Sequence, residues 1–284
     1  MIKVFQFLVI CTISIVFASI ASAQVYTTID YPGAIATSLN GGPNPEGTSV
    51  GSYTDISFVT HGFTLTAKGV FTSFDPPGSR LTVPNFISPQ GAIVGSYNDA
   101  SGVSHGFILE GGNYTTVDYP GAPGTTLTGL SPSGEIVGFY CRTSSCFTDH
   151  SFILSKKGIF TTIDPPGATS STASSVNPSG AIVGAYTDSH GVGHGYLYNG
   201  TFTTIDFPGA TFTFAGGNNP PGDIVGEYND NAGVGHSFLL SNGVFTSFDP
   251  PGASFSDASG INPGGIIVGI YFDSAGEHGY IRTP

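Results

Sequence analysis

Residues 181–206 read AIVGAYTDSHGVGHGYLYNGTFTTID, and this phrase returns along the chain with small changes. Two further copies are AIVGSYNDASGVSHGFILEGGNYTTVD at 92–118 and DIVGEYNDNAGVGHSFLLSNGVFTSFD at 223–249. Short runs of Val, Ile, Phe, Tyr and Thr alternate with Asn-Asp, Ser-Gly and Pro-Gly turns, so no helical period survives. Each copy therefore predicts short β-strands joined by tight turns.

The aspartate that ends the phrase marks the repeat. It occurs at intervals of 42 to 46 residues, as Asp30, Asp75, Asp118, Asp164, Asp206 and Asp249. Each repeat holds four runs of strand character: a stretch of small and polar residues, an IVG run, a His-Gly-Phe-like run and an FTTID-like run. Four strands in a repeat of this length match one blade of a β-propeller.

The two ends of the chain carry complementary parts of one repeat. Residues 24–30 supply only an FTTID-like run, whereas the last residues stop after a His-Gly-Tyr run. We therefore expect an all-β fold in a single domain, 24–284. It would be a six-bladed β-propeller of six repeats of about 43 residues, with four strands per blade. The N-terminal strand would complete the last blade and leave no exposed sheet edge. An open β-solenoid is the alternative, although it would not need complementary ends.

The sequence also has a second, longer period of two repeats. The residue after the repeated aspartate alternates between an aromatic residue and proline, in the order Tyr31, Pro76, Tyr119, Pro165, Phe207 and Pro250. The first three aromatic-type repeats begin 88 residues apart. This alternation predicts three copies of a two-blade unit and hence a pseudo-threefold ring.

Residues 1–23 have the pattern of a secretory signal peptide. Lys3 precedes an apolar run that leads to the small residues Ala21-Ser22-Ala23. We expect cleavage, no membrane span afterwards, and a secreted or periplasmic protein; a retained membrane anchor is the alternative. Cys141 and Cys146 enclose four residues. This spacing predicts a disulfide in an oxidising compartment, with a metal site as the alternative.

Composition and missing motifs exclude several classes of function. The chain has 19 acidic and 7 basic residues, a balance that argues against nucleic acid as a partner because phosphates need clustered Lys and Arg. No G-x-S-x-G, phosphate-binding loop or H-E-x-x-H motif occurs, and no D-x-[DN]-x-[DN]-G calcium loop. We expect neither a catalytic residue set nor a cofactor or metal site, with calcium as the remaining possibility. Three acids without repeat partners stand beside the predicted turns: Glu46, Glu135 and Asp223.

Taken together, the NPSG-like turn, the IVG strand, the Tyr-x-Asp turn, the His-Gly-Phe run and the FTTID-x-PGA close resemble the HAF-repeat family of bacterial extracellular proteins. The resemblance covers essentially all of 24–284. The eponymous His-Ala-Phe is replaced by His-Gly-Phe, His-Gly-Tyr or His-Ser-Phe, and Tyr140-Cys141-Arg142 replaces the Tyr-x-Asp of Tyr97 and Asp99. The resemblance implies export and repetition, and it implies no reaction.

Aspartate and histidine recur together in nearly every repeat. The pairs are Asp55 with His61, Asp99 with His105, Asp188 with His194, Asp230 with His236, and Asp273 with His278. A reacting centre should break the symmetry of the ring, so we interpret these pairs as structural braces of the hairpin rather than as catalytic groups. The aspartate that ends each FTTID run is expected to accept hydrogen bonds from backbone N–H groups two residues on. A calcium-binding ring of these six carboxylates is the alternative.

The sequence offers more candidate residues for binding a ligand than for catalysis. The alternate aromatics Tyr31, Tyr119 and Phe207 should emerge on one face, together with Arg142 and His190, which lie outside the repeated set. Such rings can stack on sugars or anchor a protein partner; alternatively, each ring packs against its own turn proline. The sequence thus predicts a monomeric binding or scaffolding module for a carbohydrate or protein ligand. The alternative is a calcium-dependent propeller hydrolase or lyase with a site in the central channel.

Overall fold

The computed structural model describes residues 24–143 and 148–284, and within them every regular element is a β-strand. The prediction of an all-β chain is therefore confirmed. The predicted signal peptide, 1–23, and Cys146 lie outside the described residues, so the cleavage and the disulfide stay predictions. In the ranges that the structure covers, no helix has the length and apolar character that crossing a bilayer requires.

The strands fall into groups of four, and within each group every strand is antiparallel to its neighbour. We name these groups units A to F. Unit A comprises β2 (Ala36–Gly41), β3 (Ser49–Thr54), β4 (Thr60–Leu65) and β5 (Phe71–Phe74). Unit B comprises β6 (Leu81–Ile87), β7 (Ile93–Asn98), β8 (Ser104–Glu110) and β9 (Asn113–Val117). Unit C comprises β10 (Thr125–Leu130), β11 (Ile136–Cys141), β12 (Asp149–Leu154) and β13 (Phe160–Thr162).

The second half of the chain repeats the pattern. Unit D comprises β14 (Ser170–Val176), β15 (Ile182–Thr187), β16 (Gly193–Tyr198) and β17 (Phe202–Ile205). Unit E comprises β18 (Phe212–Asn218), β19 (Ile224–Asn229), β20 (Gly235–Ser241) and β21 (Val244–Phe248). Unit F comprises β22 (Phe255–Ile261), β23 (Ile267–Phe272), β24 (Glu277–Thr283) and β1 (Val25–Ile29).

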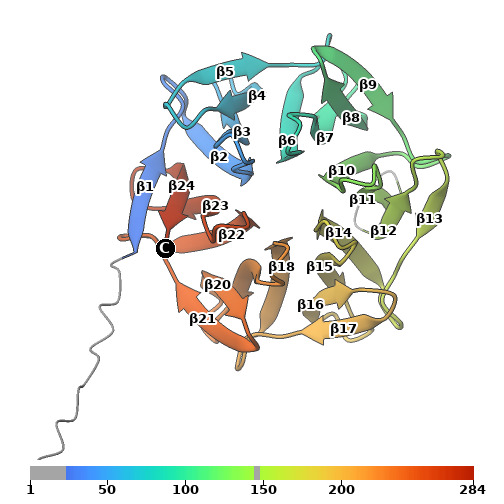
Figure 1. Cartoon of the computed structure of the whole chain (residues 1–284), viewed down its shortest axis with the longest axis vertical. Coiled ribbons are helices and arrows are strands. Elements are labelled where there is room, and N and C mark those ends of the chain that lie inside the picture. Colours follow the sequence, from blue (N-terminus) through green and yellow to red (C-terminus); the bar gives the residue numbers. More distant parts are fainter. Residues whose placement is uncertain (1–23, 144–147) are drawn as a thin grey trace, which may run out of the picture.

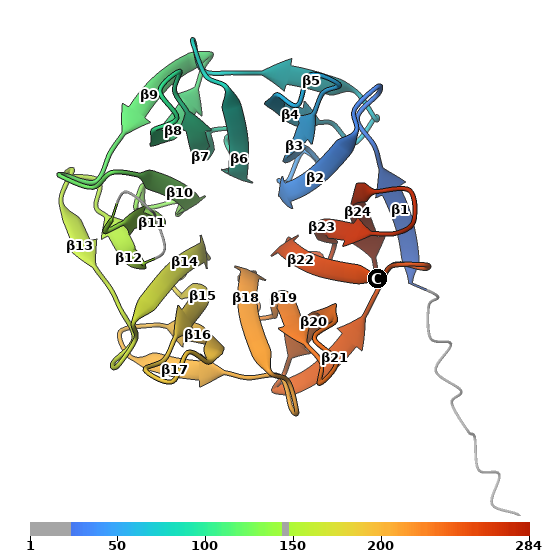
Figure 2. The same ribbon diagram turned by 180° about the vertical axis from the view of Figure 1, so that it is seen from behind.

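The units stand around a central opening, with the first strand of each unit innermost and the FTTID-like strand at the rim (Figure 1). The view from behind shows the same arrangement (Figure 2). Strand β1 lies beside β24 and pairs with it antiparallel from Val25↔Thr283 to Ile29↔Gly279. The two ends of the described chain therefore build one sheet together.

The glycine of the IVG run decides how closely the two inner strands approach. A Cβ atom on Gly184 would lie 2.0 Å from the carbonyl oxygen of Thr172 and 2.8 Å from the Tyr196 ring. The equivalent glycine of unit E, Gly226, would bring a Cβ within 1.9 Å of the Phe214 carbonyl oxygen. Only a residue without a side chain fits between the first strand and the aromatic ring of the third, which explains why this residue recurs in every unit.

Each first strand carries a β-bulge at the same place, and in units A, B and C the bulged side chain hydrogen-bonds to the next unit. In unit A the register shifts between Leu39 and Gly41, and Asn40 at the bulge donates from Nδ2 to the carbonyl oxygen of Pro84, at 3.0 Å. In unit B, Asn85 donates likewise to Leu127 O at 2.9 Å. These bonds tie neighbouring inner strands together around the opening.

The hydrophobic core is divided among the junctions between units. In one junction, Val137 of unit C packs with Ala173, Ile182 and Tyr196 of unit D. In another, Val268 of unit F packs with Leu39 and Phe63 of unit A. Because each sheet buries its faces against its neighbours, no unit has a core of its own. Burying a ring such as Phe63 contributes about 2–3 kcal/mol, and this contribution needs both units of the junction.

Removal of β1 should therefore weaken the whole protein. A chain that starts at residue 35 in place of residue 24 exposes the edge of β24 and loses the β1–β24 ladder. We expect its melting temperature, measured by circular dichroism, to fall by at least roughly 10 °C. The variant Val25→Thr, which changes a 57% exposed residue of β1, is the control and should melt with the wild type. Equal melting of the truncated and full-length chains would contradict the inferred role of β1.

Candidate functional site

One face of the ring carries the hairpins between the second and third strands, and we refer to it as the hairpin face. Its hairpin loops are 55–59, 99–103, 188–192, 230–234 and 273–276 in the described residues. Each of these loops begins with an aspartate that closes the turn. Oδ1 of Asp55 accepts hydrogen bonds from the N–H groups of Ser57 at 2.8 Å and Val59 at 3.0 Å. Hydrogen bonds of this kind hold the loops in fixed shapes.

Hydrogen bonding also lowers the pKa of the hairpin aspartates, because each bond stabilises the charged form. For Asp99, the Ser101 hydroxyl and the Val103 N–H have the largest effects in this direction and lower the pKa to about 2. For Asp230, the Val234 N–H lowers the pKa most. The lowered pKa values favour the ionised form of these carboxylates at neutral pH.

The repeated histidines lie between two aspartates, and the closer partner is not the one expected. Nδ1 of His105 is 3.0 Å from the carboxylate of Asp118, whereas Nε2 is 3.6 Å from Asp99. The same order holds for His194, at 2.9 Å from Asp206 and 3.8 Å from Asp188. The further pairs follow it: His61 with Asp75 and Asp55, His236 with Asp249 and Asp230, and His278 with Asp30 and Asp273.

The five expected Asp–His pairs of the hairpins are present, at 3.3–3.8 Å, and one expectation about the aspartates is corrected. The FTTID aspartates were expected to accept from backbone N–H groups, but they bind histidine Nδ1, and it is the hairpin aspartates that bind the backbone. The physical reason is the strand pairing: Gly195, next to His194 on the third strand, pairs with Ile205, next to Asp206 on the fourth. Histidine thus joins the rim strand to the hairpin, and in unit C, which lacks the hairpin aspartate, His150 keeps the bond to Asp164 at 2.8 Å.

The charge of these histidines is set by opposing effects. Partial burial lowers the pKa of His236, but the hydrogen bond and charge of Asp249, followed by those of Asp230, outweigh it and raise the pKa above the ordinary value. His61 and His278 behave in the same way with Asp75 and Asp30 as the main partners. The stabilising contribution of protonation is therefore present at acidic pH and is lost as the pH rises through the folded-state pKa.

The three aromatic candidates are partly covered by tyrosines of the second strand. The ring of Tyr31 stacks on Tyr53 with centroids 3.6 Å apart and planes at 2°. Tyr119 stacks on Tyr140 at 3.7 Å, and Phe207 on Tyr228 at 3.6 Å. Each ring also contacts a rim-strand phenylalanine edge-on, Phe71, Phe160 and Phe245 respectively. The covering group is thus a tyrosine, whereas the sequence had offered the turn proline as the alternative to an open platform.

Arg142 and His190 lie exposed on the hairpin face, as expected from their positions in the loops. The side chain of His190 is 84% exposed, and its Nδ1 is 3.4 Å from Asp188. The N–H of Arg142 donates to Thr148 O at 3.0 Å. Cys141, one residue earlier, is buried. The two exposed side chains belong to units C and D and are not brought into contact with the aromatic stacks by any described hydrogen bond.

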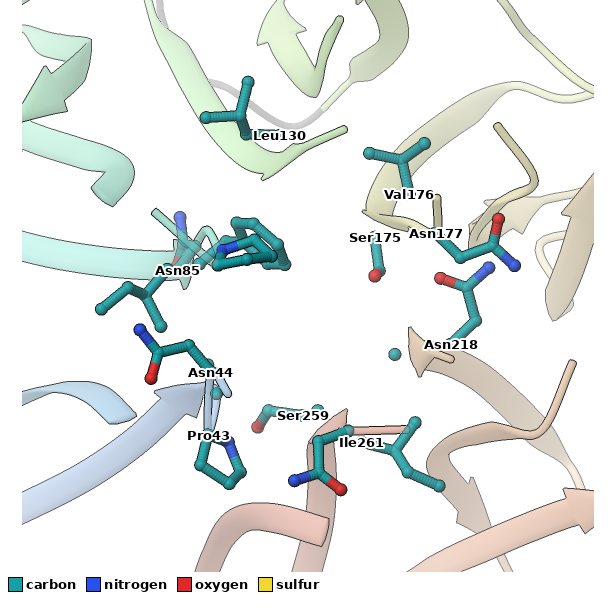
Figure 3. A pocket seen from close by; sticks show the side chains of 18 of the residues that line it. Pro43, Asn44, Asn85, Leu130, Ser175, Val176, Asn177, Asn218, Ser259 and Ile261 are labelled. Carbon is teal, nitrogen blue, oxygen red and sulfur yellow. The ribbon is translucent and has the colours of Figure 1, made fainter. Parts of the chain in front are cut away.

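The central opening is a second candidate region, and the bulged residues line it. A cavity of about 450 Å³ is bordered by polar bulge residues and by residues two positions earlier, among them Asn40, Asn85, Thr128, Ser174, Phe214, Asp257 and Ser259. At the end formed by the NPSG-like turns, a second cavity is lined by apolar and amide side chains (Figure 3). Its lining includes Pro43, Leu130, Val176 and Ile261, which come from different units.

Two acids near the junction of units E and F break the symmetry of the ring, and one of them, Asp257, borders the channel cavity. Asp257 occupies a position where the other units have Ser38, Val83, Thr126, Thr172 and Phe214, and its Oδ1 is buried without a hydrogen-bond partner. Burial raises the pKa of Asp257 to about 6, although the Ser259 hydroxyl lowers it. Glu227 of unit E faces the same junction; burial, and then the charge of Asp257, raise its pKa to about 7.

This pair was not predicted from the sequence. The acids without repeat partners that were noted there, Glu46, Glu135 and Asp223, stand beside the turns and are not among the residues that border the 450 Å³ cavity. A comparison of the first strands position by position would have found Asp257, because it is the one ionisable residue at its position in six strands. Two carboxyls do not make a metal centre by themselves. Across residues 24–143 and 148–284, no group of three or more His, Cys, Asp and Glu side chains could hold a metal ion.

Comparisons with known proteins give likenesses in structure alone. No protein-family model matches the chain, and no curated protein matches it. An Aleuria aurantia lectin, whose structure is described as a six-bladed β-propeller with a fucose recognition mode, superposes with a TM-score of 0.54 at 12% identity. The superposition covers 90% of this chain and 93% of the lectin.

Two further solved structures have the same relation to this chain. A putative TolB from Agrobacterium tumefaciens superposes with a TM-score of 0.58 at 15% identity, over 86% of this chain and 89% of that one. A virginiamycin B lyase from Staphylococcus aureus superposes with a TM-score of 0.53 at 11% identity, over 92% and 100%. At these identities the likenesses show that the chain has a β-propeller fold, and they say nothing of its ligand.

The raised pKa of Glu227 predicts a dependence of stability on pH. Between about pH 4.5 and 7 the unfolded chain loses this proton while the folded protein keeps it, so the free energy of unfolding falls as the pH rises. Glu227→Gln removes this loss, which amounts to at most about 3 kcal/mol. We expect the variant to melt several degrees above the wild type near pH 8 and together with it near pH 4.

The control for this experiment is Glu110→Gln, which makes the same change on an exposed residue of β8. It should leave the pH profile of the melting temperature unchanged. A Glu227→Gln profile parallel to that of the wild type would show that the carboxyl titrates normally in the folded protein.

Proposed function

We propose that the chain is an exported, HAF-repeat-type β-propeller of six blades, closed by β1, that acts as a binding or scaffolding module for a carbohydrate or protein ligand. The six junction cores, the β1–β24 ladder and the likeness to a six-bladed lectin support the blade count and the closure. The signal-like residues 1–23 support export to a secreted or periplasmic location. The likenesses to a fungal lectin and to TolB proteins are consistent with binding as the role.

The observation that carries this proposal is the exposed apolar rim of the hairpin face. Phe58 is 82% exposed and Ile56 is 78% exposed, both on the first hairpin. Three of the other hairpins add a valine each at equivalent positions, namely Val103, Val192 and Val234, which are 41%, 41% and 37% exposed. Apolar side chains held at the tips of rigid loops are typical of a surface that another molecule covers.

Phe58 is held in position at a conformational cost. Its φ is 61°, in the left-handed region, where the equivalent residues of the other hairpins are the glycines Gly102, Gly191 and Gly233. A phenylalanine at such a φ is unfavourable by about 1–3 kcal/mol. A residue with a strained backbone and an exposed ring does not stabilise its own loop. This supports a role for Phe58 in contacts with a ligand. Arg142 and His190 on neighbouring hairpins would add polar contacts.

The test changes both exposed residues at once. The double variant Ile56→Ser, Phe58→Gly should melt at or slightly above the temperature of the wild type, because neither side chain is buried and glycine relieves the strain at position 58. Binding should be measured on arrays of neutral and acidic glycans and on an array of bacterial envelope proteins. We expect at least about a tenfold loss of affinity for the ligand that the wild type binds, since exposed aromatics at interfaces often contribute this much.

A matched control is available on the opposite face. Ile159 is 60% exposed at the hairpin between β12 and β13, so Ile159→Ser changes a similar apolar area away from the hairpin face. It should bind like the wild type. Retained binding by the double variant, or no binding of any glycan or protein by the wild type, would count against the proposal.

A second candidate function rests on the channel acids. Asp257 has an unpaired buried oxygen beside a cavity of about 450 Å³, and Glu227 lies at the same junction. Two carboxyls with raised pKa values would suit a hydrolase or lyase that uses a general acid. This function requires that the purified protein cleave a polysaccharide substrate. Asp257→Asn should then lose that activity, with a matching loss of the acidic form in the pH–rate profile; a wild type without such activity would leave only the binding role.

A further inference from the structure

The stacked aromatics of units A, C and E define a recurring cage for one ring. In unit C the Tyr119 ring lies flat on Tyr140, edge-on to Phe160 at 5.0 Å, and 5.8 Å from Phe152. Its hydroxyl lies 3.0 Å from Oγ1 of Thr162 on the rim strand. Four positions thus form the cage: the second-strand tyrosine, the third-strand ring, the rim-strand ring and a rim-strand hydroxyl.

Unit D has the cage without its ring. Pro165 stands where Tyr119 stands, and the equivalent cage residues are Tyr186, Tyr196, Phe202 and Thr204. All four border a cavity of about 370 Å³, together with Pro165, Pro166, Thr201 and Thr203. The cavity therefore lies at the place that the chain's own aromatic ring takes in unit C, although Tyr196 is fully buried and only Tyr186, Phe202 and Thr204 of the four are open to an occupant. We refer to it as the unit D slot.

The turn around the slot is the same in both units apart from this ring. The N–H of Ala168 donates to Pro165 O at 3.0 Å, as that of Ala122 donates to Tyr119 O at 3.1 Å. The main chain of the turn therefore follows the same path, and the missing part is a side chain alone. The main chain already fills the position of the turn backbone in unit D. Only a ring that enters from solvent can therefore occupy the slot.

The filled cages show what an occupant must look like. The ring has to be six-membered or of similar size and flat enough to stack at about 3.7 Å, as Tyr119 does on Tyr140. It also gains from a hydroxyl directed at Thr204, as the Tyr119 hydroxyl is directed at Thr162. A pyranose offers both features, since one face of the sugar ring carries only C–H groups and its edge carries hydroxyls. The net charge of −12 disfavours acidic sugars.

We propose that the unit D slot binds a neutral pyranose residue of a glycan, stacked on Tyr186 and hydrogen-bonded to Thr204. This site rests on the proposed binding function and names its ligand class. A sugar suits this slot better than the tyrosine side chain of a peptide. Pro165 and Pro166 close one side of the slot, and a terminal pyranose can enter it without a peptide main chain that would have to lie beside these prolines. A single pyranose should bind with about millimolar affinity, typical of so small a ligand.

The experiment fills one cage and empties another. Pro165→Tyr converts residues 164–168 into Asp-Tyr-Pro-Gly-Ala, the sequence at 118–122, and should close the slot with the chain's own ring. Tyr119→Pro converts 118–122 into Asp-Pro-Pro-Gly-Ala, the sequence at 164–168, and should open a second slot in unit C. The probes are the methyl pyranosides of glucose, galactose, mannose and N-acetylglucosamine, with N-acetyl-tyrosinamide as the peptide probe. Binding is followed by saturation-transfer NMR and calorimetry.

We expect the wild type to bind at least one pyranoside, Pro165→Tyr to lose at least about tenfold in affinity at the unit D slot, and Tyr119→Pro to have one site more than the wild type. Tyr186→Ala should also lose binding, and it keeps the test open if Pro165→Tyr fails to fold. No pyranoside bound by the wild type, or undiminished binding by Pro165→Tyr, would overturn the slot. Binding of N-acetyl-tyrosinamide in place of sugars would assign it to a peptide instead. Because Pro165→Tyr leaves Ile56 and Phe58 in place, binding to the glycan and protein arrays that it retains while it loses the pyranosides would belong to the hairpin face, so the slot and the hairpin face are tested separately.

Discussion

The close contact between the first and second strands of each unit is the constraint on which the rest of the structure depends. The IVG glycine lets the second strand approach the bulged first strand so closely that the third-strand ring lies directly over it. The bulge in turn directs residues such as Asn40 and Asn85 toward the neighbouring unit. Without this approach the inner strands would not fit around one opening, and neither the junction cores nor the channel lining would form.

The repeat made the strands and their order predictable, because strand character, turn residues and spacing all recur with the same period. Partners across the sheet were harder to assign. His105 was matched to Asp99, six residues earlier, although it bonds to Asp118, thirteen residues later. Sequence proximity favours the first pairing, whereas antiparallel register brings the second pair closer. Only knowledge of which strands are neighbours decides between them.

The candidate site was predictable in part for the same reason. The alternation of aromatic residues and proline after the repeated aspartate was visible, but its meaning was not. What it controls is whether a ring covers Tyr53, Tyr140 and Tyr228, as it does in units A, C and E, or whether a space remains over Tyr186. The acids Asp257 and Glu227 escaped notice because each looks ordinary in its own strand. They stand out only when six strands are superposed around the channel.

The pairing of β1 with β24 joins the described strands that are synthesised earliest and latest. Until β24 has been synthesised, β1 has no partner, and the core between units F and A lacks one side. Contacts of such long sequence separation form slowly because they close a large loop. Before that step, the unpaired edge of β1 is free to pair with a strand of another chain, so the late arrival of β24 makes association between incompletely folded copies a competing reaction.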